Sequence, residues 1–185
     1  MPAPEISFLQ LDGRQAARHR DDFAALAAEV YADLPSGWGD EQASYFSDRF
    51  AVQCRQPGFV LAEARHGGYL VGYAFGVPLR PATSWWRQLT TPLPADVTTE
   101  YPGRTFALAD LAVRAAWRRQ GIATALYRLV MANRPEERAT LTVPPAAGPA
   151  QSAYRSWGWR KIAKTRDEGP GSPLLDVLIL TLPNR

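Results

Sequence analysis

The feature that most constrains this chain is a short apolar run, residues 110–113, that passes through an arginine-rich turn to Gly121 and an amphipathic stretch. The apolar residues of that stretch recur at helical spacing before a stop signal at residues 133–135: they are Ile122, Ala125, Leu126, Leu129 and Val130. The pattern predicts a strand, a turn and a helix in succession. A helix that begins at such a turn directs backbone N–H groups and the positive end of its dipole into the turn.

The charge of this segment is of one sign. No acidic residue lies between Asp110 and Glu136. Five arginines lie in that interval: Arg114, Arg118, Arg119, Arg128 and Arg134. Backbone N–H groups, a helix dipole and guanidinium groups together suit a pyrophosphate or a similar multiply charged anion. The alternative is a solvated surface run beside a loop glycine, and the strand before and helix after the turn favour the anion site.

Two segments of the chain resemble a known family. The spacing Arg118-x-x-Gly121-x-Ala123, after the strand at 110–113, resembles the acetyl-coenzyme A signature of the GCN5-related N-acetyltransferases (GNAT). The segment 153–159, with Tyr154 followed by Gly-aromatic, resembles the end of a helix in the same family. A strand-like run at 139–143 lies between them, in the family's order, and the resemblance extends from about residue 5 to residue 182. It implies an α/β fold with a mixed central sheet that splays apart at the cofactor and has helices on both faces.

Length and composition favour a single domain over residues 1–185. A chain of 185 residues with 46% apolar and 21% charged residues buries a substantial core. Hydrophobic periodicity predicts the order strand, two helices, three strands, helix, strand, helix and two strands. The elements beyond the central segment are expected near residues 6–11, 23–34, 38–50, 59–64, 69–77, 159–164 and 174–182. The dipeptide Gly67-Gly68 predicts a hairpin turn.

Several classes of function and partner are not expected. The net charge is +3, but only two of the 21 basic residues are lysine and no basic patch interleaved with aromatic residues occurs, so nucleic acid is not an expected partner. No cluster with metal-ligand spacing occurs, and the lone Cys54 cannot form an internal disulfide. The N-terminus resembles no signal peptide and no run is long enough to span a membrane, which predicts a cytoplasmic protein. The oligomeric state stays open, a homodimer included.

The two histidines are not expected to be catalytic. His66 falls in the predicted hairpin turn, and His19 lies on the polar side of the first predicted helix. A Ser-His-Asp or Cys-His arrangement of a hydrolase therefore has little support.

A long irregular segment runs from Pro78 to Gly103 and contains the adjacent residues Trp85 and Trp86. Loops of this length within a compact domain are either functional or disordered, and adjacent tryptophans argue against disorder. The resemblance implies that this segment forms a wall of the acceptor site, with both tryptophans contacting the substrate. The alternative is that they cap the core from outside. Asp96 and Glu100 in the same segment would attract a cationic acceptor.

The resemblance also implies the roles of the cofactor-binding residues. The backbone of Leu111, Ala112 and Val113 would hold the pantetheine arm and polarise the thioester carbonyl. The diphosphate would be bound by the side chains of two arginines and by the following backbone amides: Arg118, Arg119, Gln120, Gly121, Ile122, Ala123 and Thr124.

Two side chains are candidates for proton transfer. Tyr154 stands where the family's general acid protonates the departing thiolate, and the alternative is a packed tyrosine at a helix end. Asp110, directly before the thioester-holding strand, is the candidate base, acting through water. The alternative is that Asp110 pairs with a nearby arginine, which would depress its pKa. Two departures from the family pattern weaken the prediction of catalysis: Ala147 replaces an asparagine, and Thr142 stands where some members carry a glutamate base.

Three functions follow from these patterns. The first is an acyltransferase that moves an acetyl group from acetyl-coenzyme A to a primary amine of a small molecule or peptide. The second is a degenerate member of the family that binds an acyl-coenzyme A without turnover. The third is a basic nucleic-acid-binding domain, whose only support is charge.

Overall fold

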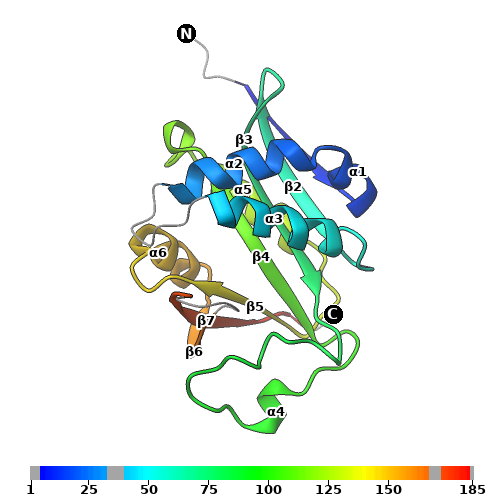
Figure 1. Ribbon diagram of the computed structural model, residues 1–185, viewed down its shortest axis with the longest axis vertical. Coiled ribbons are helices and arrows are strands. Elements are labelled where there is room, and N and C mark those ends of the chain that lie inside the picture. Colours follow the sequence, from blue (N-terminus) through cyan, green and yellow to red (C-terminus); the bar gives the residue numbers. More distant parts are fainter. Residues whose placement is uncertain (1–4, 33–39, 167–171, 184–185) are drawn as a thin grey trace. The chain divides into compact units, whose positions relative to one another are not determined.

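A computed structural model of the chain (Figure 1) describes residues 5–32, 40–166 and 172–183, with residues 40–45 described by their backbone only. In chain order the elements are β1 (Ile6–Leu11), α1 (Gly13–Arg18), α2 (Arg20–Ala32), α3 (Asp40–Gln53), β2 (Val60–His66), β3 (Tyr69–Pro78), α4 (Ala95–Thr98), β4 (Thr105–Val113), the 3-10 helix η1 (Ala115–Trp117), α5 (Ile122–Met131), β5 (Arg138–Val143), α6 (Gly148–Ser156), β6 (Arg160–Arg166) and β7 (Leu174–Thr181). The described strands form a seven-stranded sheet in the order β1-β2-β3-β4-β5-β7-β6. The α/β class with a mixed sheet, predicted from the resemblance, is confirmed, because β4 and β5 are parallel whereas β1–β2 and β5–β7 are antiparallel.

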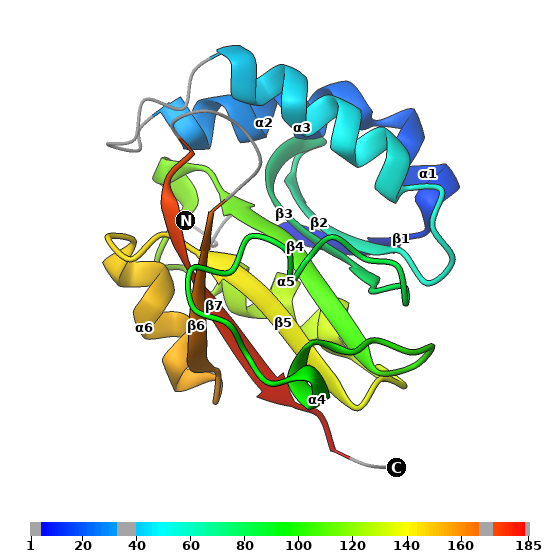
Figure 2. The same cartoon turned by 60° about the horizontal axis from the view of Figure 1, so that its bottom comes forward.

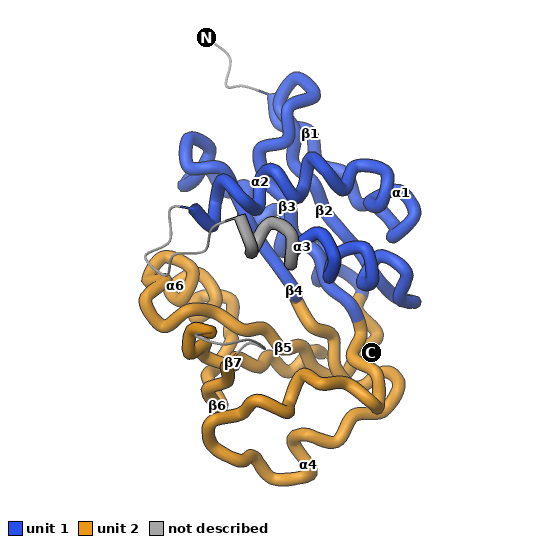
Figure 3. The backbone as a smooth tube through the Cα atoms, in the orientation of Figure 1, with its two compact units in different colours: residues 1–77, 109–133 blue, residues 78–108, 134–185 orange. Residues whose placement is uncertain are grey.

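The chain forms two compact units (Figure 3). Unit 1 comprises residues 1–77 and 109–133, and unit 2 comprises residues 78–108 and 134–185. β4 passes from unit 2 into unit 1 at Ala109. A single domain over residues 1–185 stays a prediction.

Unit 1 has an aromatic core between α2, α3 and the first strands. Phe23 of α2, Phe50 of α3 and Tyr73 of β3 are each 0% exposed. The ring of Phe23 lies 5.6 Å from those of Phe50 and Tyr73, and Phe50 lies 5.1 Å from Phe75. Edge-to-face and tilted contacts at these distances stabilise aromatic pairs beyond their buried area. The helical periodicity of the N-terminal half therefore reflects helices held against β3, and Figure 2 shows α2 and α3 along one face of the strands.

The opposite face of unit 1 is covered by α5. Gly72 of β3 faces this side, because successive strand residues point to opposite faces and Tyr73 faces α2. A Cβ atom at Gly72 would lie 3.0 Å from the carbonyl oxygen of Ala112 and 3.1 Å from the Leu126 side chain. The missing side chain thus lets β4 and α5 approach β3 closely.

Unit 2 contains the antiparallel strands β5, β7 and β6. The register of the parallel pair β4–β5 runs from Thr105 opposite Arg138 to Ala107 opposite Thr140. The long segment after β3 lies along β6, where the N–H of Thr90 donates to the carbonyl of Lys164 at 2.9 Å. This contact and a β-bridge between Leu89 and Thr165 order a segment that sequence alone describes only as irregular.

Several local predictions differ from the structure. The first helical region begins earlier than expected, because Asp12 and Gln15 form a capping box that starts α1 at Gly13. β4 begins at Thr105 rather than near Asp110. The hairpin turn at Gly67 and Gly68 is confirmed, with φ of +54° and +85°. The predicted helix end at 35–37 lies outside the described residues, as does most of the predicted turn at 167–173.

His66 is the last residue of β2 rather than part of the turn, and its ring lies 5.0 Å from Trp117. His19 is exposed, but it stands at the C-cap of α1, between α1 and α2, rather than on a face of a helix. Cys54 is buried, and burial raises the pKa of its thiol to about 11. In the part of the chain that the structure describes, no helix has the length and apolar character needed to cross a bilayer.

Candidate active site

The turn between β4 and α5 is built by backbone conformation. Gly121 has φ of +79° and stands at the N-cap of α5, where a left-handed conformation turns the chain into the helix without a Cβ penalty. Arg119 also has a positive φ, +62°, which costs a non-glycine residue about 1 kcal/mol. Among the described residues, no side chain caps the first turn of α5. The amides of Ile122 and the two residues after it therefore form a helix N-terminus suited to an anion.

Two arginines stand at this turn with exposed side chains, Arg118 and Arg119. The Nε of Arg118 donates to the carbonyl oxygen of Val113 at 3.0 Å, which anchors the start of the guanidinium beside the end of β4. The sequence prediction of two arginines next to a helix N-terminus thus agrees with the local geometry of unit 1. Ligand binding by these residues stays a prediction.

The other arginines of the basic run have different surroundings. Arg114 forms an ion pair with Glu29 of α2, donates to the carbonyl of Leu70 at 2.8 Å, and lies over the Tyr69 ring at 4.6 Å. Burial lowers the pKa of Arg114. This side chain ties the end of β4 to α2 and β3, so it belongs to the scaffold rather than to an anion site.

Arg134 is likewise engaged within unit 2. It donates to the two carboxylate oxygens of Glu136 at 2.9 and 2.7 Å and lies 4.0 Å over the Phe106 ring. Arg128 is exposed in the last turn of α5, at the far end of the helix from the turn. The positive charge of the segment is therefore divided between a structural part and a pair of exposed arginines at the turn.

The carboxylate of Asp110 lies among polar groups from α2, α3 and β3. Its Oδ1 accepts a hydrogen bond from the Tyr31 hydroxyl at 2.5 Å, and its Oδ2 accepts one from the Tyr73 hydroxyl at 2.7 Å. Burial raises the pKa of the Asp110 carboxyl, and the two tyrosines, the Leu111 N–H and the charge of Arg49 oppose that rise. The alternative of an arginine pair that depresses the pKa is therefore wrong for this residue. A carboxylate with a raised pKa is better matched to accepting a proton near neutral pH.

The remaining residues predicted to hold the pantetheine arm lie at the end of β4. Ala112 and Val113 are buried and Leu111 is partly buried. The N–H of Leu111 hydrogen-bonds the Asp110 carboxylate. Binding of the pantetheine arm by this backbone stays a prediction.

Tyr154 lies in α6 of unit 2, where its ring is 5.7 Å from Trp157 and 6.0 Å from Trp159. Gly158 has φ of +91° and ends the helix, which agrees with the predicted tyrosine and Gly-aromatic segment at a helix end. Ala147 stands at the N-cap of α6 and provides no side-chain cap. Tyr154 is partly buried, and its role as an acid stays a prediction.

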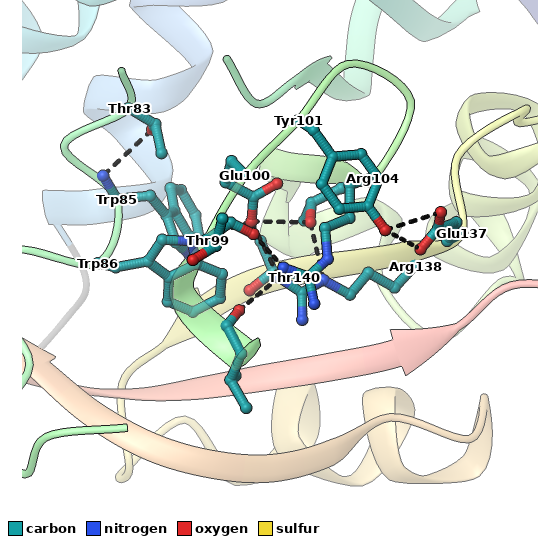
Figure 4. Close-up of polar contacts among 12 residues, drawn as sticks. Thr83, Trp85, Trp86, Thr99, Glu100, Tyr101, Arg104, Glu137, Arg138 and Thr140 are labelled. Atoms are coloured by element: carbon teal, nitrogen blue, oxygen red, sulfur yellow. Dashed lines mark hydrogen bonds and ion pairs between the residues drawn. The ribbon is translucent and has the colours of Figure 1, made fainter. Parts of the chain in front are cut away.

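Trp86 of the long segment takes part in a polar cluster around the buried side chain of Glu100 (Figure 4). The Nε1 of Trp86 donates to Oε1 of Glu100 at 3.0 Å, and Arg138 donates to the same oxygen at 2.9 Å. Thr105 also donates to Oε1 of Glu100, at 2.9 Å, and accepts from Nε of Arg138 at 2.8 Å. The rings of Trp85 and Trp86 meet edge to face at 6.5 Å.

The expectation that Glu100 attracts a cationic acceptor is wrong, because its side chain is 0% exposed and already paired with Arg138. Asp96 is exposed in the first turn of α4, so the same expectation stays open for that residue. Sequence reasoning missed the Glu100–Arg138 pair and both tyrosines beside Asp110. Within the described ranges, no group of histidine, cysteine, aspartate and glutamate side chains is placed to hold a metal ion.

The chain is similar in sequence and in fold to known proteins. Residues 23–159 match the model of the acetyltransferase (GNAT) family. This match covers more than half of the chain, and the chain belongs to the GNAT family of acetyltransferases. The family implies acyltransferase activity as a class. No match was found among curated proteins.

Solved structures show the same fold at low sequence identity. A protein from Pyrococcus horikoshii OT3 is 16% identical, with 97% of this chain and 99% of that chain covered and a TM-score of 0.67. The ribosomal-protein-alanine N-acetyltransferase from Brucella melitensis is 15% identical, with 95% and 99% covered and a TM-score of 0.61. The PaiA N-acetyltransferase from Thermoplasma acidophilum, solved in complex with coenzyme A, is 11% identical, with 96% and 99% covered and a TM-score of 0.62.

Proposed function

We propose that this protein transfers an acetyl group from acetyl-coenzyme A to a primary amine of a small molecule or peptide. The observation that carries the proposal is the α5 N-terminus, which has no side-chain cap among the described residues and which stands at the end of the turn after β4, next to Arg118 and Arg119. A diphosphate is the group that such a set of donors recognises. The coenzyme A complex of the Thermoplasma acidophilum relative supports the same choice of ligand.

The chemistry assigns a task to each candidate residue. The neutral amine attacks the thioester carbonyl carbon, so that a C–N bond forms and the C–S bond breaks. The proton lost by the amine goes to the Asp110 carboxylate, whose raised pKa suits that task. Tyr154 gives a proton to the departing thiolate, and the backbone of residues 111–113 holds the thioester.

The acceptor side of the proposal rests on the long segment after β3. We propose that Trp85 and Trp86 contact the acceptor through their ring faces. The indole N–H of Trp86 is already bonded to Glu100, so it is not the group that recognises the amine.

The proposal is tested by ligand binding and turnover. Acetyl-coenzyme A should raise the melting temperature, and coenzyme A thiol should be released with at least one amine from a panel of amino acids, polyamines and peptide N-termini. Replacing both Arg118→Glu and Arg119→Glu should weaken acetyl-coenzyme A binding about 100-fold or more, since two charge-assisted contacts of about 1.5–3 kcal/mol are lost. Arg87→Glu, which reverses an exposed charge in the long segment, is the matched control.

Two results would contradict the proposal in different ways. Unchanged acetyl-coenzyme A binding in the double variant would remove the diphosphate site from the β4–α5 turn. Binding without thiol release across the whole amine panel would instead indicate a non-catalytic acyl-coenzyme A-binding protein.

A Tyr154→Phe variant tests the acid separately. A thiol is a good leaving group, so we expect a loss of about tenfold in kcat, smaller than the usual effect of general acid catalysis. Unchanged kcat would remove Tyr154 from that role.

A further inference from the structure

Each carboxylate oxygen of Asp110 accepts a hydrogen bond from a tyrosine hydroxyl. Tyr31 reaches Oδ1 from the last turn of α2, and Tyr73 reaches Oδ2 from the centre of β3. These residues are 79 and 37 positions away from Asp110 in the sequence. All three belong to unit 1.

The two tyrosines differ in their access to solvent. Tyr73 is 0% exposed and its ring packs 5.6 Å from Phe23 and 6.0 Å from Phe46. Tyr31 is partly exposed and packs at the margin of the same core. Of the two tyrosines whose hydroxyl groups touch the carboxylate, Tyr31 is therefore the one whose side chain is partly exposed.

The charge around the carboxylate is weakly compensated. The groups that act on Asp110 are Tyr31 from α2, Arg49 from α3, Tyr73 from β3 and the N–H of Leu111 on β4 itself. The arginine contributes the smallest of these effects. A carboxylate held mainly by hydroxyl donors can take up a proton from one of them without breaking an ion pair.

We propose, on the basis of the proposed function, that Tyr31 contacts the acceptor amine and passes its proton to Asp110, while Tyr73 only positions the carboxylate. In this step an N–H bond of the amine breaks as its nitrogen bonds to the thioester carbonyl carbon, and the proton binds Oη of Tyr31. The original hydroxyl proton of Tyr31 moves along the 2.5 Å hydrogen bond to Oδ1 of Asp110. The products are the acetylated amine, an unchanged Tyr31 and a protonated Asp110, and the thiolate from the broken C–S bond takes its proton from Tyr154, so charge and atoms balance.

The test compares Tyr31→Phe with Tyr73→Phe, using Tyr69→Phe as the control because Tyr69 is exposed on β3 and away from the carboxylate contacts. The readouts are kcat/KM against pH, with an amine that the wild type acetylates, and the Asp110 carboxyl titration followed by 13C NMR. Acetyl-coenzyme A thermal shifts establish that each variant is folded.

Both phenylalanine variants should raise the pKa of Asp110, because each removes a hydrogen bond to the charged form. The acid limb of the kcat/KM profile should move to higher pH by about one unit. On the high-pH plateau Tyr31→Phe should lose about 50-fold or more, within the usual range for a lost proton transfer, whereas Tyr73→Phe should lose less than about fivefold. Tyr69→Phe should match the wild type in both readouts.

Equal plateaus for Tyr31→Phe and Tyr73→Phe, with acetyl-coenzyme A binding retained, would overturn the relay and leave the acetyltransferase proposal standing. If the Tyr31→Phe protein does not fold, the NMR titrations of the Tyr73→Phe and wild-type proteins serve as the test instead. If Asp110 titrates at the same pH in those two proteins, the tyrosines do not hold its charge and the relay is likewise overturned. Absence of wild-type turnover with every amine defeats the proposed function itself.

Discussion

Asp110 and Glu100 are two carboxylates near the same strand, and they are held in opposite ways. Glu100 precedes β4 and is paired with the guanidinium of Arg138 at 2.9 Å, with Thr105 and Trp86 as further donors. Asp110 lies within β4 and accepts hydrogen bonds from two tyrosine hydroxyls instead. Burial raises the pKa of Asp110.

This difference separates a structural carboxylate from a candidate for chemistry. The Arg138 guanidinium compensates the charge of Glu100 at Oε1, although Oε2 is buried without a hydrogen bond among the described residues. A carboxylate without such a partner keeps a perturbed pKa, which is a property of many functional sites. Burial alone is therefore a poor guide to function in this protein, and the compensation of the charge is a better one.

The largest effect is expected when the ion pair between Glu100 and Arg138 is broken. Arg138→Met leaves the Glu100 charge buried without its partner, and we expect the free energy of unfolding to fall by about 3–5 kcal/mol. Urea denaturation measures this loss. Adding Glu100→Gln to the same protein should recover a large part of it, because the orphaned charge is then removed. A loss below about 1 kcal/mol in the single variant would mean that the Glu100–Arg138 pair is not structural, and the contrast with Asp110 would be lost.

The second effect concerns Asp110, whose charge is only weakly compensated. Asp110→Asn should lower kcat/KM by about 100-fold or more. Its melting temperature at pH 7 should equal or exceed that of the wild type. Because the native pKa of Asp110 is raised, the folded state binds more protons than the unfolded state as the pH rises above 3.8. The stability of the wild type therefore falls over that pH range, whereas the Asn variant has no carboxyl group and does not lose this stability. Melting curves from pH 3 to pH 8 check this, and a marked loss of stability at pH 7 would make Asp110 structural.

A smaller effect is expected at Thr105, which bridges the compensated pair. Thr105→Val keeps the shape of the side chain and removes a donor to Glu100 and an acceptor for Arg138. We expect a loss of about 1–2 kcal/mol in the free energy of unfolding, measured by urea denaturation, with kcat unchanged. A change in the acid limb of the rate profile would show that the two carboxylates are coupled.

The smallest effect is expected at Trp86. Trp86→Phe removes the indole N–H that donates to Glu100 and should cost about 1 kcal/mol of stability. An acceptor contact through the ring face survives this change, so KM for the amine should stay within about twofold, whereas Trp85→Ala should raise it. Unchanged KM in both variants would support the alternative that the tryptophans only cap the core.

The sequence predicts those parts of the molecule whose signals are local. Helical periodicity, the Gly67-Gly68 turn and the strand, turn and helix around Gly121 all depend on residues a few positions apart, and the structure agrees with each. The start of α1 also had a local signal, the pair Asp12 and Gln15, which periodicity alone passes over.

The site partners have no such signal. Glu100 and Arg138 are 38 positions apart, and Tyr31 is 79 positions from Asp110. Contacts at these separations are created by the packing of strands and helices, so composition and spacing contain no trace of them. The sequence therefore predicted Asp110 as a candidate base but assigned it an arginine as its alternative partner.

Cys54 has a consequence for how the reaction can be followed. It is the chain's single cysteine, it is buried, and its thiol has a pKa of about 11. The thiolate is the form that attacks disulfide reagents, so this side chain is nearly silent toward them at neutral pH. A chromogenic disulfide added to the native protein should then report released coenzyme A continuously, with little background from the polypeptide.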